Sequence, residues 1–152
     1  MGGSDDEWAL ESQVCFALDA ANRACAALYR ILLHDAHLTH TQYLVMAVLW
    51  ERDNVSVKEL GNALRLESGT LSPLLKRLEA AGHVRRRRHP LDERSVRVHI
   101  TREGAALQER LRSVPRRIAA SMDMDEAALV DLRDRLDQLI TAFDATTASL
   151  RR

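Results

Sequence analysis

The 152 residues suit one domain with one hydrophobic core, since 46% of them are hydrophobic while only 4% are aromatic. The formal net charge is zero, but segment 76–97 carries eight Lys or Arg against three acids, and segment 123–144 carries seven acids against two Arg. No apolar run approaches the ~20 residues of a membrane span, and segment 1–11 lacks the apolar stretch of a signal peptide. Two cysteines do not make a disulfide framework. We therefore expect a cytoplasmic protein without membrane contact.

Two helices are predicted in the first third of the chain. Residues 7–36 repeat apolar side chains at helical spacing without Gly or Pro, which indicates one long helix. Thr39 or Thr41 caps the next helix, which ends at a turn near residues 52–54. Its expected buried face consists of Tyr43, Leu44, Met46, Ala47 and Leu49.

The middle of the chain has the pattern of a helix-turn-helix. Ser56 and Glu59 form a capping box at the start of a short helix, 57–64, whose expected inward residues are Leu60, Ala63 and Leu64. A second helix begins at 67–68 and ends before Gly82, which supplies a left-handed C-cap. Its apolar stripe consists of Leu71, Leu74, Leu75 and Leu78. Two short helices joined by a few residues predict a recognition helix in the second position.

A β-hairpin and two further helices complete the predicted elements. Segments 83–89 and 95–101 read as strands on either side of a polar turn, the layout of a wing. Thr101 caps the next helix, in whose first turn Gly104 is tolerated, and Pro115 kinks that helix before its end near residue 122. Asp125 caps a last helix that reaches about Ala148.

The element order ααααββαα predicts a mainly α fold with a small β wing. We expect a single domain, 1–152, with a winged helix-turn-helix at 40–101 and dimerisation helices at 1–36 and 102–152. The terminal helices carry more apolar surface than the winged part can cover. A two-fold homodimer would bury that surface and pair two recognition helices on a palindromic site in double-stranded DNA.

The candidate DNA-binding side chains lie on the recognition helix and the wing. The hydroxyl side chains near the start of the recognition helix suit phosphates or base edges. Lys76 and Arg77, one to two turns further along, can reach the DNA backbone or a guanine. Arg94 at the hairpin tip suits the minor groove, and Asp92 could hold it by a charge-assisted bond. The alternative is that the hydroxyls only cap the helix and the arginines form a solvated strand face. The full set is Ser68, Thr70, Ser72, Lys76, Arg77, Arg86, Asp92 and Arg94.

Two sequence segments, SGTLSPLLKRLEAAG and the wing DERSVRVHIT, resemble the MarR family of dimeric winged-helix regulators. The resemblance covers nearly the whole chain, and Asp92 with Arg94 matches a specific mark of the family. It implies a transcriptional repressor whose wing arginine contacts the minor groove.

Cys15 lies on the apolar side of the first predicted helix, where a cysteine is ordinarily a small buried hydrophobe. The segments ESQVCFAL, AANRACAALY and LTHTQYLVMAVLWE resemble the organic hydroperoxide resistance regulators, a MarR subgroup. The resemblance implies that Cys15 senses the peroxide and that two tyrosines hydrogen-bond it, one from its own helix and one from the partner subunit's next helix. Tyr29 matches the first, but His40 replaces the second and Asp19 replaces a third family tyrosine.

These departures have opposite chemical consequences. An imidazolium at position 40 would favour a thiolate at Cys15, whereas an ionised Asp19 one turn away would disfavour it. Cys25 lies too far along the same helix for a disulfide, so the chain resembles the one-cysteine type, in which oxidised Cys15 condenses with a low-molecular-weight thiol.

Other functions remain open on the sequence. A MarR regulator released by a small aromatic ligand would use Cys15 only to line a pocket. His34, His37 and His40 recur at a spacing that suggests zinc, but a helix boundary falls between them. A thiol peroxidase is a further alternative, but this chain has no obvious resolving cysteine for turnover. It also has no P-loop or dinucleotide-binding fingerprint. The sequence therefore predicts neither an enzyme nor a cofactor.

Overall fold

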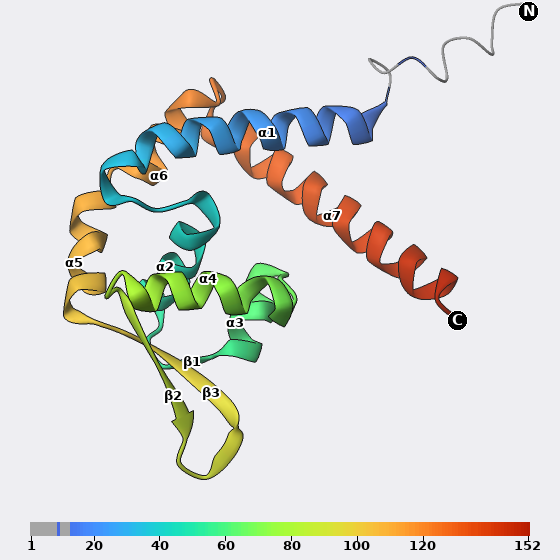
Figure 1. Cartoon of the computed structure of the whole chain (residues 1–152). Coiled ribbons are helices and arrows are strands. Elements are labelled where there is room, and N and C mark those ends of the chain that lie inside the picture. Colours follow the sequence, from blue (N-terminus) through green and yellow to red (C-terminus); the bar gives the residue numbers. More distant parts are fainter. Residues whose placement is uncertain (1–8, 10–12) are drawn as a thin grey trace, which may run out of the picture. The chain divides into compact units, whose positions relative to one another are not determined.

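A computed structural model of the chain describes residue 9 and residues 13–152 (Figure 1). The chain divides into two compact units, one ending at Val114 and one formed by Pro115–Arg152. The first unit contains the predicted helix-turn-helix and wing, and the second contains the C-terminal helices. In the described part of the chain, no helix combines the length and the apolar character needed to cross a membrane.

The predicted first helix is shorter than expected. Helix α1 covers Val14–Leu32, and a 3₁₀ turn, His34–Ala36, follows it. His37 then adopts a left-handed conformation, with φ 53°, which reverses the chain. The expected start at residue 7 lies outside the described residues. Helix α1 has no buried residue in the single chain.

Helix α2, His40–Glu51, begins and ends where the sequence predicts. Thr39 is its cap, and a capping box with Gln42 satisfies two backbone N–H groups. The buried side is shifted from the expected one, because Val45 is fully buried whereas Leu44 and Ala47 are half-buried. Its other buried residues are Tyr43, Met46 and Leu49.

The helix-turn-helix is formed by α3, Val57–Leu64, and α4, Ser68–Ala80. Ser56 and Glu59 make the predicted capping box, with N···O distances of 2.8 and 3.0 Å. Gly82, at φ 82°, ends α4 as predicted, since its N–H and the next one bond back to the carbonyls of residues 79 and 78. All four stripe leucines of α4 are buried, as is Leu60, but Ala63 is exposed, contrary to our expectation.

The wing is part of a three-stranded antiparallel sheet ordered β1-β3-β2. Strands β2, Val84–His89, and β3, Asp92–Ile100, form the predicted hairpin, with a bulge between residues 88 and 89. Strand β3 begins three residues before the expected residue 95, so the polar turn covers only residues 90–91. Strand β1, Val55–Ser56, is too short to show alternation and was not predicted. It places the start of α3 beside the centre of β3 through the pairs Val55 with Val98 and Ser56 with Arg97.

The predicted kinked helix is instead two helices, α5 at Arg102–Leu111 and α6 at Val114–Ser121. Pro115 is in the first turn of α6, where a missing N–H costs nothing, so it starts a helix and does not kink one. Gly104 is required and not merely tolerated, because a Cβ there would lie 2.1 Å from the carbonyl oxygen of His83. Thr101 caps α5 as expected, through the N–H of Gly104.

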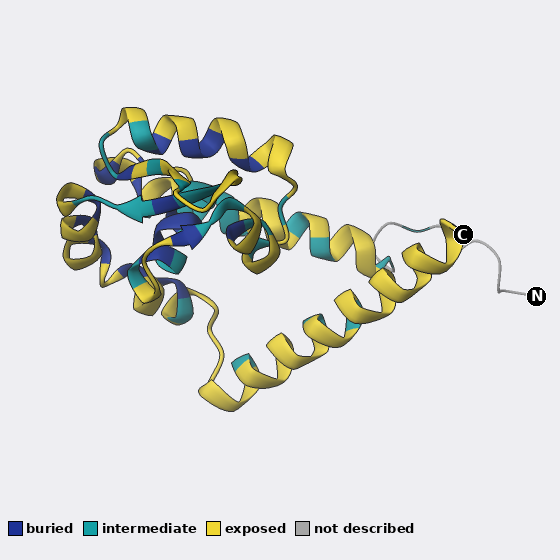
Figure 2. Ribbon diagram, turned by 90° about the horizontal axis from the view of Figure 1, so that it is seen from below, coloured by how far each residue is buried: buried dark blue, intermediate teal, exposed yellow. Residues whose placement is uncertain are grey.

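Most of the core lies in the first unit, around the sheet and the leucines of the helix-turn-helix, while Ile118 of α6 is buried in the second (Figure 2). The last helix, α7, covers Glu126–Leu150 and begins at the predicted cap, Asp125. None of its 25 residues is buried, and Phe143 is 50% exposed in the single chain. This helix presents a long apolar stripe that its own unit does not cover.

Candidate DNA-binding surface and thiol region

A hollow of about 500 Å³ lies among α3, α4 and the wing. It brings together four of the predicted DNA-binding residues, Ser68, Ser72, Arg86 and Arg94. Lys58 of α3 lines the same hollow, is exposed, and was not predicted to be functional. A lone lysine in a short helix gives no signal in the sequence. Its position beside the recognition helix and wing becomes visible only in the fold.

The start of α4 is open to an anion. Its N-cap residue, Glu67, makes no side-chain cap, and although its carbonyl accepts the N–H of Thr70, no described side chain caps the first two N–H groups of the first turn. Thr70 is exposed in that turn, and Lys76 and Arg77 are exposed further along. Among the described residues, neither cation has a hydrogen-bond or ion-pair partner, so both can meet a phosphate or a base edge.

The wing tip is organised differently from the prediction. Asp92 accepts a hydrogen bond from the backbone N–H of Arg94 at 3.1 Å and does not hold its guanidinium. A short acidic side chain that bonds the backbone two residues on is a common turn-forming contact. The carboxylate therefore shapes the backbone at the tip, while the exposed side chain of Arg94 stays available for DNA.

Arg86 is tied to the recognition helix. Its guanidinium bonds to the carboxylate of Glu79 at 2.8 and 2.9 Å, and the same carboxylate accepts its backbone N–H at 2.9 Å. These bonds from Arg86, its backbone N–H first, lower the pKa of Glu79. Glu79 is near the end of α4, so the pair joins the recognition helix to the wing strand.

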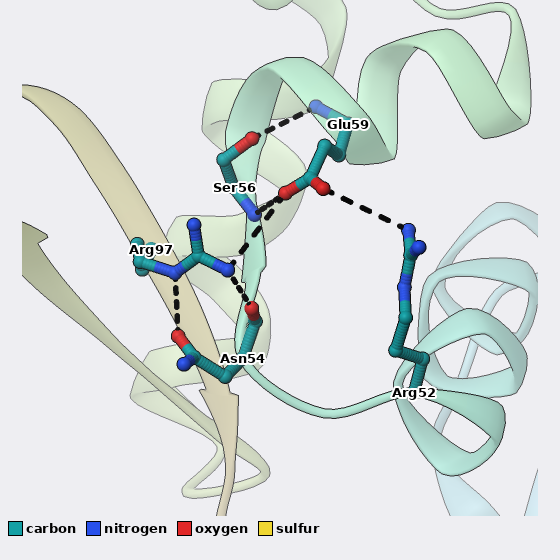
Figure 3. Close-up of polar contacts among 5 residues, drawn as sticks. All are labelled: Arg52, Asn54, Ser56, Glu59 and Arg97. Atoms are coloured by element: carbon teal, nitrogen blue, oxygen red, sulfur yellow. Dashed lines mark hydrogen bonds and ion pairs between the residues drawn. The ribbon is translucent and has the colours of Figure 1, made fainter.

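A second polar cluster joins the wing to the start of α3 (Figure 3). Arg97 of β3 donates to the side-chain oxygen of Asn54 at 2.6 Å and also to the Asn54 carbonyl. Glu59 lies 3.9 Å from both Arg97 and Arg52, and hydrogen bonds from Ser56 lower its pKa. Asn54 adopts a left-handed conformation, φ 59°, which turns its carbonyl and side chain to one guanidinium. The cluster thereby fixes the wing beside the capping box.

The proposed thiol-site residues do not come together within one chain. Cys15 is exposed in the first turn of α1, and Tyr29 lies fourteen residues on along the same unbroken helix, about 21 Å away. Tyr29 therefore cannot reach Cys15 from its own helix, which corrects our expectation. Tyr29 stacks instead on His40, with ring centroids 3.8 Å apart and an interplanar angle of 12°.

The two substituted positions have defined surroundings. Asp19 forms an ion pair with Arg23, one turn further along α1, and both side chains are exposed. Partial burial lowers the pKa of His40, which favours a neutral imidazole. Position 40 thus presents an uncharged ring that pairs with Tyr29, while the charge of Asp19 has a partner within its own helix.

The zinc alternative has no support in this geometry. Within residues 13–152, no three His, Cys, Asp or Glu side chains are grouped as a metal site requires. His34 and His37 have ring centroids 6.5 Å apart, whereas His40 stacks on Tyr29. The helix boundary at Thr39 separates the three histidines.

Comparison with known proteins agrees with this fold. The MarR family profile matches residues 38–96. The chain is 48% identical to the HTH-type transcriptional regulator TtmR of Methylorubrum extorquens (strain PA1) over 141 residues, which is 90% of this chain and 72% of that protein. It is 38% identical to the organic hydroperoxide resistance transcriptional regulator of Bacillus subtilis (strain 168) over 135 residues, 89% of this chain and 92% of that one.

Solved structures show the same architecture. The structure of reduced AbfR bound to DNA has a TM-score of 0.75 and 33% identity, with 88% of this chain and 93% of that chain covered. The crystal structure of AbfR of Staphylococcus epidermidis has a TM-score of 0.70 and 34% identity, with 87% and 94% covered. A winged helix-turn-helix with these relatives defines a class of DNA-binding transcriptional regulators. The chain belongs to the MarR family.

Proposed function

We propose that the chain is a homodimeric repressor that binds a palindromic operator in double-stranded DNA and releases it when Cys15 is oxidised. The hollow between α4 and the wing carries the DNA-binding half of this proposal, because it gathers Ser68, Ser72, Arg86 and Arg94 on one surface. The proposed contacts also include Thr70, Lys76 and Arg77 on α4, with Asp92 shaping the wing tip.

The exposed thiol supports the sensing half. A Cys15 thiolate would attack the distal oxygen of an organic hydroperoxide, forming an S–O bond as the O–O bond breaks and the alcohol leaves after taking up a proton. The resulting sulfenic acid would condense with a low-molecular-weight thiol, giving a mixed disulfide and water. Oxidation would thus insert polar bulk at α1.

The position of Tyr29 and His40 supports a site shared between subunits. Since α1 keeps Tyr29 about 21 Å from Cys15 of its own chain, a Cys15 thiol that meets the stacked pair would have to come from the other subunit. Oxidation at such a junction would change the spacing of the two recognition helices and so release DNA. Two relatives are linked to oxidation by name: the Bacillus subtilis organic hydroperoxide resistance transcriptional regulator, and AbfR, which has been solved in reduced, overoxidised and disulfide-formed states, the first two of them bound to DNA.

The test compares wild type with Cys15→Ser and Cys25→Ser. DNA binding and intact mass are followed on one sample treated with cumene hydroperoxide and a low-molecular-weight thiol. We expect wild type and Cys25→Ser to gain one thiol adduct per chain and leave the DNA, while Cys15→Ser stays unmodified and bound.

Continued peroxide-driven release of the Cys15→Ser chain would reject Cys15 as the sensor. Release of that variant by a phenolic ligand, but not by peroxide, would favour a ligand-responsive repressor. Catalytic consumption of peroxide by the wild type would point to a peroxidase, whereas stoichiometric consumption supports a sensor.

A further inference from the structure

The arginines of β2 are divided between two faces of the wing. Side chains alternate along a strand, and Arg86 turns to the recognition helix, where Glu79 holds it. Arg85 and Arg87 therefore lie on the opposite face, where both are exposed. We call this face the outer wing face and define it by Arg85, Arg87, Arg97 and His99, which are cross-strand neighbours.

The positive charge on this face is only partly balanced by groups of the chain itself. Arg97 is held by Asn54, with Glu59 3.9 Å away. The guanidinium groups of Arg85 and Arg87 have no hydrogen-bond or ion-pair partner in the described part of the chain, although their backbones pair with β3. Arg87 is directly opposite Arg97, and like charges placed opposite each other destabilise a sheet. An anion from outside the chain would relieve this repulsion.

The face is also hollowed. A hollow of about 330 Å³ is lined by basic and uncharged residues without an acid, namely Asn54, Arg87, Arg88, His89, Pro90, Arg97 and His99. A neighbouring hollow of about 420 Å³ includes Arg85, Arg87 and Arg102 together with Asp53 and Glu103. Asp53 already accepts the backbone N–H of Ile100 at 2.8 Å. The outer wing face is thus an open, net-positive surface.

We propose that the outer wing face binds the phosphate backbone of the duplex DNA that flanks the recognised site. The inference rests on the proposed DNA-binding function. One face of the hairpin is tied to the recognition helix through Arg86 and Glu79. With Arg94 in a groove, the opposite face would be turned away from the recognised site, toward the DNA that flanks it. Backbone contacts there add affinity without reading sequence, and each neutralised phosphate steepens the salt dependence of binding by about one unit of log–log slope.

The experiment uses nested duplexes around a site that the full chain selects from a pool with a randomised core. One duplex ends at the grooves reached by the wings, and the other extends by about one helical turn, ~10 base pairs, on each side. We expect the wild type to bind the longer duplex several-fold more tightly and with a steeper salt slope. Arg85→Gln/Arg87→Gln should lose this gain and bind the short duplex unchanged, whereas Arg87→Lys should retain most of it.

Arg112→Gln is the control, because it removes an exposed arginine just after α5 that lies outside the wing. It should keep the full gain from flanking DNA. The inference is overturned if the wild type binds both duplexes equally, if the double variant keeps the gain, or if that variant weakens both duplexes by the same factor. Failure to select any duplex would instead overturn the proposed DNA-binding function, and this inference with it.

Discussion

His40 and His83 are two histidines whose pKa values the fold lowers. Burial lowers the pKa of both, and the charge of Arg110 lowers that of His83 further, against a smaller opposing effect of Glu103. The ring nitrogen Nδ1 of His83 is buried without a hydrogen-bond partner. Each histidine therefore favours its neutral form in the folded chain.

This predicts a loss of stability as the solution is acidified. The unfolded chain takes up protons near the ordinary histidine pKa of 6.5, while the folded chain takes them up only at lower pH. The contribution of both groups is therefore complete above pH 6.5 and is lost as pH falls below it. Urea unfolding between pH 7.5 and 5.5 should show the decrease, and His40→Gln/His83→Gln should flatten it. The same dependence of stability on pH in that variant would contradict the role given to His40 and His83.

Single elements depend on close backbone contacts and on a few polar bonds. Gly104 places α5 against the start of β2, and its carbonyl accepts the indole N–H of Trp50 at 2.9 Å. Gly104→Ala should destabilise the chain by about 1–3 kcal/mol, because the new Cβ would meet a backbone oxygen that cannot move alone.

Gly69→Ala is the matched control, since a Cβ there meets nothing within 4 Å. It is expected to be neutral or to stabilise α4 by up to about 1 kcal/mol. Urea unfolding of both variants tests the pair. Equal effects would show that helix propensity, and not the contact with His83, determines the result at Gly104.

Arg97 fixes the wing to the helix-turn-helix through Asn54. Arg97→Ala should cost about 1 kcal/mol of unfolding free energy and loosen the wing, which amide exchange along β3 would report. Arg97→Lys should not restore the wild-type value, because an ammonium lacks the planar fork that bonds Asn54 at two places. Arg85→Ala, an exposed wing position without a described partner, should change stability by less than about 0.5 kcal/mol. Wild-type stability in Arg97→Lys would argue against a role for the two bonds from the Arg97 guanidinium to Asn54.

At the scale of the whole molecule, α1 and α7 carry the surface that the proposed homodimer would cover. Neither helix has a buried residue in the single chain, and α7 exposes five large apolar side chains, Val130, Leu132, Ile140, Phe143 and Leu150. A two-fold interface would remove this surface from water and pair the recognition helices.

Phe143→Asp should therefore weaken the homodimer by about thirtyfold or more, the effect of losing a ~2 kcal/mol interface hot spot. DNA binding should weaken with it and become strongly dependent on protein concentration. Gln138→Asp, which adds the same charge at an exposed polar position of α7, should leave the dimer intact. Sedimentation across a concentration series tests both variants, and an unchanged dimer in Phe143→Asp would place the interface elsewhere.

Features that depend on neighbours a few residues apart were predictable from the sequence. The capping box of Ser56 with Glu59, the leucine stripe of α4, the C-cap at Gly82 and the hairpin all follow from spacing within one turn or one strand pair, where propensity and local hydrogen bonds decide. The resemblance of the wing motif to the MarR family was confirmed by the family match.

Only the tertiary structure decided which distant residues meet. Arg97 bonds to Asn54, forty-three positions away, because the two-residue strand β1 pairs with β3. A segment of two residues is too short for its sequence to predict a strand. Arg86 binds Glu79 and Tyr29 stacks on His40 for the same reason: packing of separate elements brings them together. Local spacing therefore determined the elements, whereas long-range packing determined which of their polar groups are held and which remain open to DNA.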